Sequence, residues 1–175
     1  DFSGQKFGVQ WEWNYQPRAD KWSLAERPGM LRLHAFRPLE PGNLMKAGNT
    51  LTQRSFRTAA SEVTVELDLA GMADGAQAGL CHFAKTHSAI GVRQDGGVRT
   101  LVNVNDGTIV PGPAVAGTRI WLRSQWGLDG LSRYFNSSDG KTFTDCGAPY
   151  QLTGGNYRVD RIGLACAAGS GIEIH

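Results

Sequence analysis

The densest group of side chains that could do chemistry is an acidic run in the middle of the first half of the chain. Glu62, Glu66 and Asp68 share one parity on an extended chain, so all three would project from the same face of a strand. Hydrolysis of a glycosidic bond uses two carboxyl groups about 5 to 9 Å apart, one of them protonated near neutral pH. One hypothesis is therefore a sandwich-fold glycanase with this face as the wall of a cleft.

The same run also fits a strand without a catalytic role. Its alternate positions carry Val63, Val65, Leu67 and Leu69. Strict alternation of charged and aliphatic residues is typical of a sheet with one buried and one solvated face. We favour this interpretation and predict no catalytic residue within the chain, so that the domain is not an enzyme on its own.

Other motifs that carry catalysis or bind cofactors do not occur in the sequence. It has no GxSxG elbow, no HExxH, no P-loop and no GxGxxG after a strand, and its four histidines have no recognisable partner spacing. We expect no required cofactor. Aspartates at or near glycine-containing turns are expected to support the backbone. They are Asp95, Asp129, Asp139 and Asp145.

Aromatic residues gather near the N-terminus, where Trp11, Trp13, Tyr15 and Trp22 crowd the first 22 residues. Sugar rings stack on aromatic faces, and neighbouring amides match their hydroxyl groups. Trp13 with Asn14 is well placed to be exposed, because a proline soon ends the run and favours a loop. The competing interpretation is that the tryptophans, Trp11 and Trp22 above all, anchor the core.

Arg54 is a second type of sugar-binding candidate. If Leu51 faces the core, alternation directs Thr52 and Arg54 to the outer surface. The guanidinium of Arg54 would then bind paired sugar hydroxyls or form an ion pair with Glu62 or Glu66, and the sequence leaves both open.

Two further aromatic residues, Trp126 and Tyr134, are predicted as surface candidates. Trp126 precedes a glycine, and Tyr134 lies on a predicted strand. The complete set of predicted sugar-binding residues is Trp13, Asn14, Trp22, Arg54, Trp126 and Tyr134.

These side chains need a β-scaffold to position them. Helix-period apolar patterns of ten residues or more are absent, and 23 glycines and 7 prolines separate short apolar runs. The predicted strands are 62–69, 30–33, 78–83, 89–93, 98–104, 119–123, 131–137 and 161–166.

The turns between these strands favour antiparallel pairing. Asp95-Gly96-Gly97 and Asp139-Gly140 suit tight hairpins that need positive φ, and Asn105-Asp106-Gly107 marks another turn. Many short strands without helical crossovers predict an all-β fold, with two antiparallel sheets packed as a sandwich or jelly roll. Without internal repeats or linkers, residues 1–175 are expected to form a single domain, excised from a larger protein.

Composition excludes several classes of partner. The 18 basic and 16 acidic residues are scattered, so nothing resembles the basic stripe of a nucleic-acid-binding protein. No apolar run approaches the roughly 20 residues of a membrane span. Three cysteines show no metal-ligand spacing, and Cys81 and Cys166 are expected as buried small hydrophobes, although one disulfide remains possible.

Several stretches with a specific order and spacing extend over nearly the whole chain. They include Phe2-Ser3-Gly4, Trp11-Glu12-Trp13-Asn14, Lys21-Trp22-Ser23-Leu24, residues 26–33, 49–54, 68–79, 90–92 and 134–143, and Arg161-Ile162-Gly163-Leu164. Together these stretches resemble the C-terminal concanavalin A-like domain of family 43 β-xylosidases and arabinofuranosidases.

The resemblance implies that this domain has an accessory or carbohydrate-binding role beside a catalytic β-propeller. In that role the domain contacts xylan or arabinoxylan-type glycans. The resemblance also implies export, so an extracellular or periplasmic location is expected. Domains of this fold often hold a structural Ca²⁺, for which Asp1 or a turn aspartate would serve. The alternative implied role is purely structural, as a domain that packs on the propeller.

Overall fold

The computed structural model describes residues 2–40, 43–154 and 160–168, in which the long elements are all β-strands. Two 3₁₀ turns, η1 (Ala19–Lys21) and η2 (Leu44–Lys46), lie in the N-terminal part. The strands are β1 (Glu12–Trp13), β2 (Trp22–Ser23), β3 (Arg32–Leu33), β4 (Leu51–Arg54), β5 (Ser61–Asp68), β6 (Ala76–Phe83), β7 (His87–Asp95), β8 (Val98–Asn105), β9 (Thr108–Ala114), β10 (Arg119–Trp126), β11 (Leu131–Ser137), β12 (Thr144–Asp145), β13 (Tyr150–Gln151) and β14 (Arg161–Ala168).

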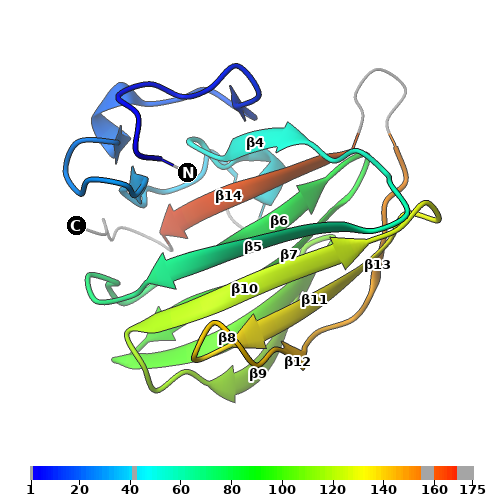
Figure 1. The fold of residues 1–175 in the computed structure, drawn as a ribbon. Helices are drawn as coiled ribbons and strands as arrows, with labels where there is room; N and C mark the ends of the chain where they lie inside the picture. The colour runs from blue at the N-terminus through cyan, green and yellow to red at the C-terminus, as the bar shows by residue number, and fades with distance from the viewer. Residues whose placement is uncertain (1, 41–42, 155–159, 169–175) are drawn as a thin grey trace.

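These strands form two stacked antiparallel sheets (Figure 1). Over the described residues, one sheet has seven strands in the order β1-β4-β14-β6-β7-β8-β9. The other has the order β12-β11-β10-β5, with β13 paired to β11, and a separate small sheet joins β2 to β3. The predicted all-β, concanavalin A-like sandwich of two antiparallel sheets is confirmed.

The core lies between the inner faces of the two sheets, toward which alternate residues of β5 and β10 point. Leu80, Ile90, Ile120 and Leu122 are fully buried there. A polar run crosses the same layer: His82 Nε2 lies 2.8 Å from Ser124 Oγ, which lies 2.9 Å from Ser132 Oγ. Hydrogen bonding makes such burial tolerable in an apolar core.

Most predicted strands are present with small changes at their ends. Of the predicted strand 30–33, only Arg32–Leu33 pairs. The strands that the sequence does not predict are β9 and the short β1, β2, β4, β12 and β13. The hairpin turns are confirmed by positive φ at Gly96, Gly97 and Gly140. The turn that contains Asp106 and Gly107, also at positive φ, closes the hairpin between β8 and β9.

Residues 2–40 and 43–50 form an N-terminal lobe with little regular structure, which covers the β4 and β14 side of the seven-stranded sheet (Figure 1). Glu12 carries an ion pair to Arg161 of β14 (2.6 Å), and its carbonyl accepts a hydrogen bond from Thr52 Oγ1 (3.0 Å). The prediction that Thr52 reaches the outer surface is wrong, because this lobe covers it; Leu51 is buried as expected.

Candidate functional site

Five aromatic side chains of the N-terminal lobe form a continuous cluster. The Trp13 and Trp22 rings are 5.5 Å apart, and Phe7 lies 4.9 Å from Trp22 and 5.5 Å from Trp13. Phe2 connects Trp11 to Phe7, with centroid distances of 5.4 and 6.4 Å. All five are partly exposed, so the aromatic cluster is neither a sealed core nor a row of isolated surface rings.

Short strands and backbone hydrogen bonds position this cluster. Trp13 pairs with Leu51 across β1 and β4, and Trp22 pairs with Leu33 across β2 and β3. Asn14 follows β1, where its backbone N–H donates to Thr50 O and its side-chain amide donates to Met45 O at 3.2 Å. Asn14 therefore holds the loop beside Trp13, and its side-chain oxygen is the part left to contact a ligand.

Two predicted members of the site lie elsewhere. Trp126 is 8% exposed and donates its Nε1–H to Phe56 O at 2.9 Å, and Tyr134 is 1% exposed. The prediction that these two are surface residues is wrong, because both point from the five-stranded sheet into the core. They do not join Trp13 and Trp22.

Arg54 is exposed at the end of β4, as predicted, but the expected ion pair with the acidic face of β5 does not form. Arg54 belongs to the seven-stranded sheet, whereas Glu62 and Glu66 lie in the other sheet. There Glu62 pairs with Arg123 at 3.3 Å and Glu66 with Arg119 at 3.2 Å. Arg54 stays a candidate for sugar hydroxyls.

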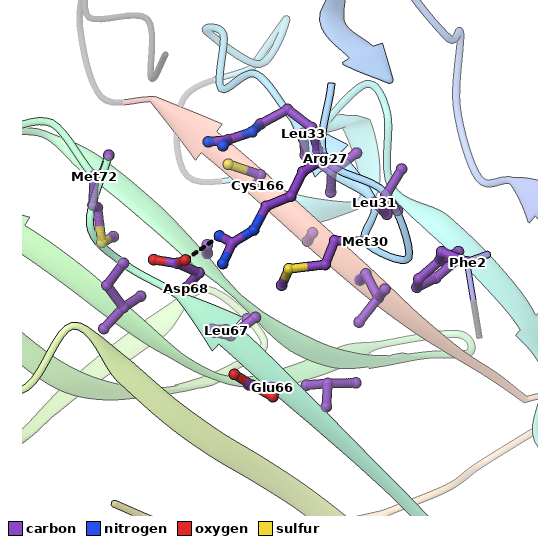
Figure 2. Close-up of a pocket in the computed structure, with 18 of the residues that line it drawn as sticks. Phe2, Arg27, Met30, Leu31, Leu33, Glu66, Leu67, Asp68, Met72 and Cys166 are labelled. Carbon is purple, nitrogen blue, oxygen red and sulfur yellow. Dashed lines mark hydrogen bonds and ion pairs between the residues drawn. The ribbon is translucent and has the colours of Figure 1, made fainter. Parts of the chain in front are cut away.

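A cavity of about 410 Å³ opens between the N-terminal lobe, β5 and β14, and Phe2 belongs both to its wall and to the aromatic cluster. Figure 2 shows Met30, Leu31 and Leu33 on its lobe side and Cys166 on β14. Most of the labelled side chains are apolar. The cavity has the volume of a small-ligand pocket, which is roughly 300 to 1,000 Å³.

The cavity wall contains an ion pair between Arg27 of the lobe and Asp68 at the end of β5 (Figure 2), and Arg32, Thr64 and Glu66 are its other polar side chains. The Arg27 guanidinium, helped by the backbone N–H of Ala70, lowers the pKa of the Asp68 carboxyl. Asp68 is therefore a permanent anion near neutral pH, which is unlike the protonated carboxyl that a glycosidase needs as its acid. Glu62 and Glu66, the other members of the predicted acidic face, are each engaged by an arginine.

Two of the turn aspartates that the resemblance implies as calcium ligands, Asp139 and Asp129, accept hydrogen bonds from their own turns. Asp139 accepts hydrogen bonds from the backbone N–H groups of Lys141 and Thr142, at 2.8 Å each, and these lower its pKa to about 2. Asp129 likewise accepts from Leu131 N–H. These carboxylates support turns, as predicted, and no three His, Cys, Asp or Glu side chains gather as metal ligands in the described residues. Asp1 lies outside the described residues.

Sequence reasoning missed Phe2 and Phe7 as members of the aromatic cluster, although both lie in the same aromatic-rich first 22 residues. Their proximity to Trp11, Trp13 and Trp22 depends on the fold of the lobe, where Phe2 forms an isolated bridge with Gly29. The cavity had no sequence signal, because its wall combines segments around residues 30, 67 and 166.

Comparisons with known proteins place the chain among parts of larger enzymes. Residues 1–159 match the family described as the beta-xylosidase C-terminal concanavalin A-like domain. A beta-xylosidase of Formosa agariphila is 32% identical over 184 residues, which cover 94% of this chain and 31% of that protein. The chain thus spans about a third of the length of this relative.

Solved structures give the same result for the fold. A bifunctional protein of Bacteroides eggerthii, described as GH43-CE, superposes with a TM-score of 0.88 at 24% identity over 99% of this chain and 24% of its own. A glycoside hydrolase of family 43, engineered to display endo-xylanase and exo-arabinofuranosidase activity, has a TM-score of 0.84 at 28% identity over 99% of this chain and 38% of its own. None of the described segments is a helix long and apolar enough to cross a membrane.

Proposed function

This chain belongs to the family of C-terminal concanavalin A-like domains of beta-xylosidases, and we propose from this premise that it is a non-catalytic accessory module that contacts xylan or arabinoxylan-type glycans. The aromatic cluster around Trp13 and Trp22 carries the proposal. Partly exposed rings offer apolar faces to the C–H faces of a sugar, and the side-chain oxygen of Asn14 accepts from a hydroxyl group.

The catalytic step belongs, in this proposal, to another part of the parent enzyme. The acidic residues of β5 support this division, because Glu62, Glu66 and Asp68 each have an arginine partner. The Arg27 guanidinium lowers the pKa of Asp68, which is opposite to the raised pKa of a general acid. A polysaccharide ligand is met outside the cytoplasm, so the proposal includes an extracellular or periplasmic location.

A second candidate function is structural packing on the catalytic part of the parent enzyme. Phe56 is 70% exposed and Leu128 is 68% exposed, on two loops that the Trp126 Nε1–H bond to Phe56 O brings together. Exposed large apolar side chains on neighbouring loops are typical of interaction surfaces. This loop end is distinct from the aromatic cluster, so the two functions are separable by substitution.

Isothermal titration of the chain with xylo-oligosaccharides and with arabinoxylan tests the proposal. We expect saturable binding in the wild type and a loss of affinity of about 5- to 150-fold in Trp13→Ala, since truncating one aromatic stacking contact removes roughly 1 to 3 kcal/mol. Trp22→Ala is expected to behave alike, because the two rings contact each other.

Phe56→Ala is the matched control, because it removes an exposed aromatic ring outside the cluster. It should leave the titration unchanged. If the wild type gives no heat of binding at millimolar sugar, glycan binding is refuted and the packing function is left. If Trp13→Ala and Phe56→Ala lose equal affinity for the sugar, the aromatic cluster is not the binding site.

A further inference from the structure

Strand β5 is the outermost strand of its sheet along one side. In the described residues β5 pairs only with β10, through eight registered positions from Ser61 to Asp68. Its other edge carries a row of backbone N–H and C=O groups. A long, regular strand edge of this kind is a template for pairing with another strand.

The other edge strands of the two large sheets, within the described residues, are too short or contain prolines, so they are poor templates for pairing, whereas β5 has neither feature. β1 and β12 have two residues each. β9 has seven, but Pro111 and Pro113 lack backbone donors. β5 has eight residues, with no proline and no bulge in its pairing with β10.

The inner face of β5 is also incompletely covered. Val63, Val65 and Leu67 are only half-buried, whereas Ile120 and Leu122 on the adjacent β10 are fully buried. The cavity of about 410 Å³ accounts for the difference, because it lies beside β5 and is lined on its other side by Leu164 and Cys166 of β14. A strand placed against β5 would direct alternate side chains into this space.

We propose that the free edge of β5 and the cavity beside it accept one further β-strand, supplied by the longer polypeptide to which this domain belongs. The chain corresponds to about a third of the Formosa relative, so the larger part of such a protein lies outside these residues. The strand has apolar side chains toward the cavity. Its outward side chains are neutral or basic, because Glu62 and Glu66 occupy the outer face of β5.

Two other occupants fit less well. Pairing of β5 with β5 of a second copy would bring the Glu62 and Glu66 carboxylates of both copies onto one sheet face, which is unfavourable. A sugar would meet a cavity wall that is more apolar than polar and whose Arg27 and Asp68 are already paired. The inference rests on the proposed function only in assuming a parent enzyme.

Amide hydrogen exchange of the parent enzyme and of the 175-residue chain tests this proposal. We expect the outward amides of β5 to exchange about tenfold more slowly, or slower still, in the parent enzyme, because a paired strand protects them. The edge of β9 serves as the internal control and should exchange alike in both. Leu164→Arg in the parent enzyme, which places a charge in the cavity, should abolish the protection of β5, while Leu164→Met should retain it.

Several outcomes would overturn the proposal. Equal protection of β5 in both proteins means that no strand is supplied from outside the 175 residues. Protection of the 175-residue chain that rises with protein concentration identifies a second copy instead, and protection that requires added xylo-oligosaccharide identifies a sugar. Circular dichroism of the Leu164→Arg variant separates a blocked site from an unfolded domain. Sugar titration is independent of this readout, so the two proposals can fail separately.

Discussion

At the scale of single residues, the alternation of side chains along a strand indicates which of them are buried. Leu51 was correctly predicted to face the core. Trp126 shares its parity with Ile120 and Leu122 on β10, and this indicates burial, although the following glycine suggested a surface position. Tyr134 gave no such signal: its inward neighbour Ser132 is polar and buried, because the core has a polar run at this point.

His82 gives a prediction about pH. The ring is fully buried, and burial lowers its pKa to about 4 from an ordinary value of 6.5, against a small opposite effect of Asp160. As pH falls from 6.5 to 4 the unfolded chain binds a proton that the folded domain does not, so the free energy of unfolding decreases, by about 3 kcal/mol in total. Urea unfolding at pH 7 and at pH 4.5 measures this loss.

The control for this prediction is His82→Gln, which keeps a hydrogen-bonding group near Ser124. The variant is expected to be less stable at pH 7 but to lose less stability on acidification. Burial also lowers the pKa of His87, which therefore contributes to the slope in both proteins. Identical slopes in the two proteins would show that His82 is not responsible.

At the scale of elements, the alternation of apolar and polar residues and the turn residues predict most strands of the sandwich. These signals miss a strand that has neither the alternation nor a typical strand composition. β9 carries Pro111, Gly112 and Pro113, which argue against a strand, yet it pairs with β8 as an exposed edge. The predicted strand 30–33 shortens to Arg32–Leu33, which pair with β2. Residue 30 belongs to a turn instead, because the Met30 N–H donates to Arg27 O.

The pair β6 and β7 depends on two glycines that face each other, Gly79 and Gly91. A Cβ on Gly91 would lie 2.5 Å from the carbonyl oxygen of Ala78, and one on Gly79 would collide with the Ile90 backbone. We expect Gly91→Ala to lower the free energy of unfolding by roughly 1 to 3 kcal/mol, as overpacking does. Thermal unfolding would show it as a lower midpoint.

Gly4→Ala is the matched substitution at a site where an added Cβ meets ordinary contacts. It should leave the midpoint unchanged. A Gly91→Ala domain as stable as the wild type would mean that the two strands separate at little cost, and the close approach would then have no structural importance.

At the scale of the whole molecule, the sequence supported the family and the layers of the fold, because ordered motifs extend along the chain. It predicted Trp13, Asn14 and Trp22 of the candidate site, but not Phe2, Phe7 or the cavity. The aromatic cluster brings Phe2 together with Trp11 and Phe7 through the irregular lobe, and the cavity joins three segments distant in sequence. Such contacts depend on loop geometry, for which a single sequence has no periodic signal.

The whole chain is predicted to be catalytically silent. We expect no release of xylose or arabinose from aryl glycosides or arabinoxylan between pH 4 and 8, because the acidic residues of β5 are each paired with an arginine. Reducing-sugar and chromogenic assays measure this. The double variant Glu62→Gln, Glu66→Gln should likewise release no sugar. If the wild type hydrolyses these substrates and the double variant does not, the chain is a sandwich-fold glycanase.

The hydrogen-bonded run from His82 to Ser124 and Ser132 has a consequence for how the two layers are aligned. Aliphatic faces alone would tolerate a slide of one sheet over the other by a pleat, about 7 Å. Such a slide would break the contact of His82 with Ser124 and leave polar atoms without partners, which costs roughly 1 to 3 kcal/mol for each. Misaligned packing of the two sheets therefore has a higher free energy. The hydrogen-bonded run selects one alignment among the several that the apolar side chains alone would allow.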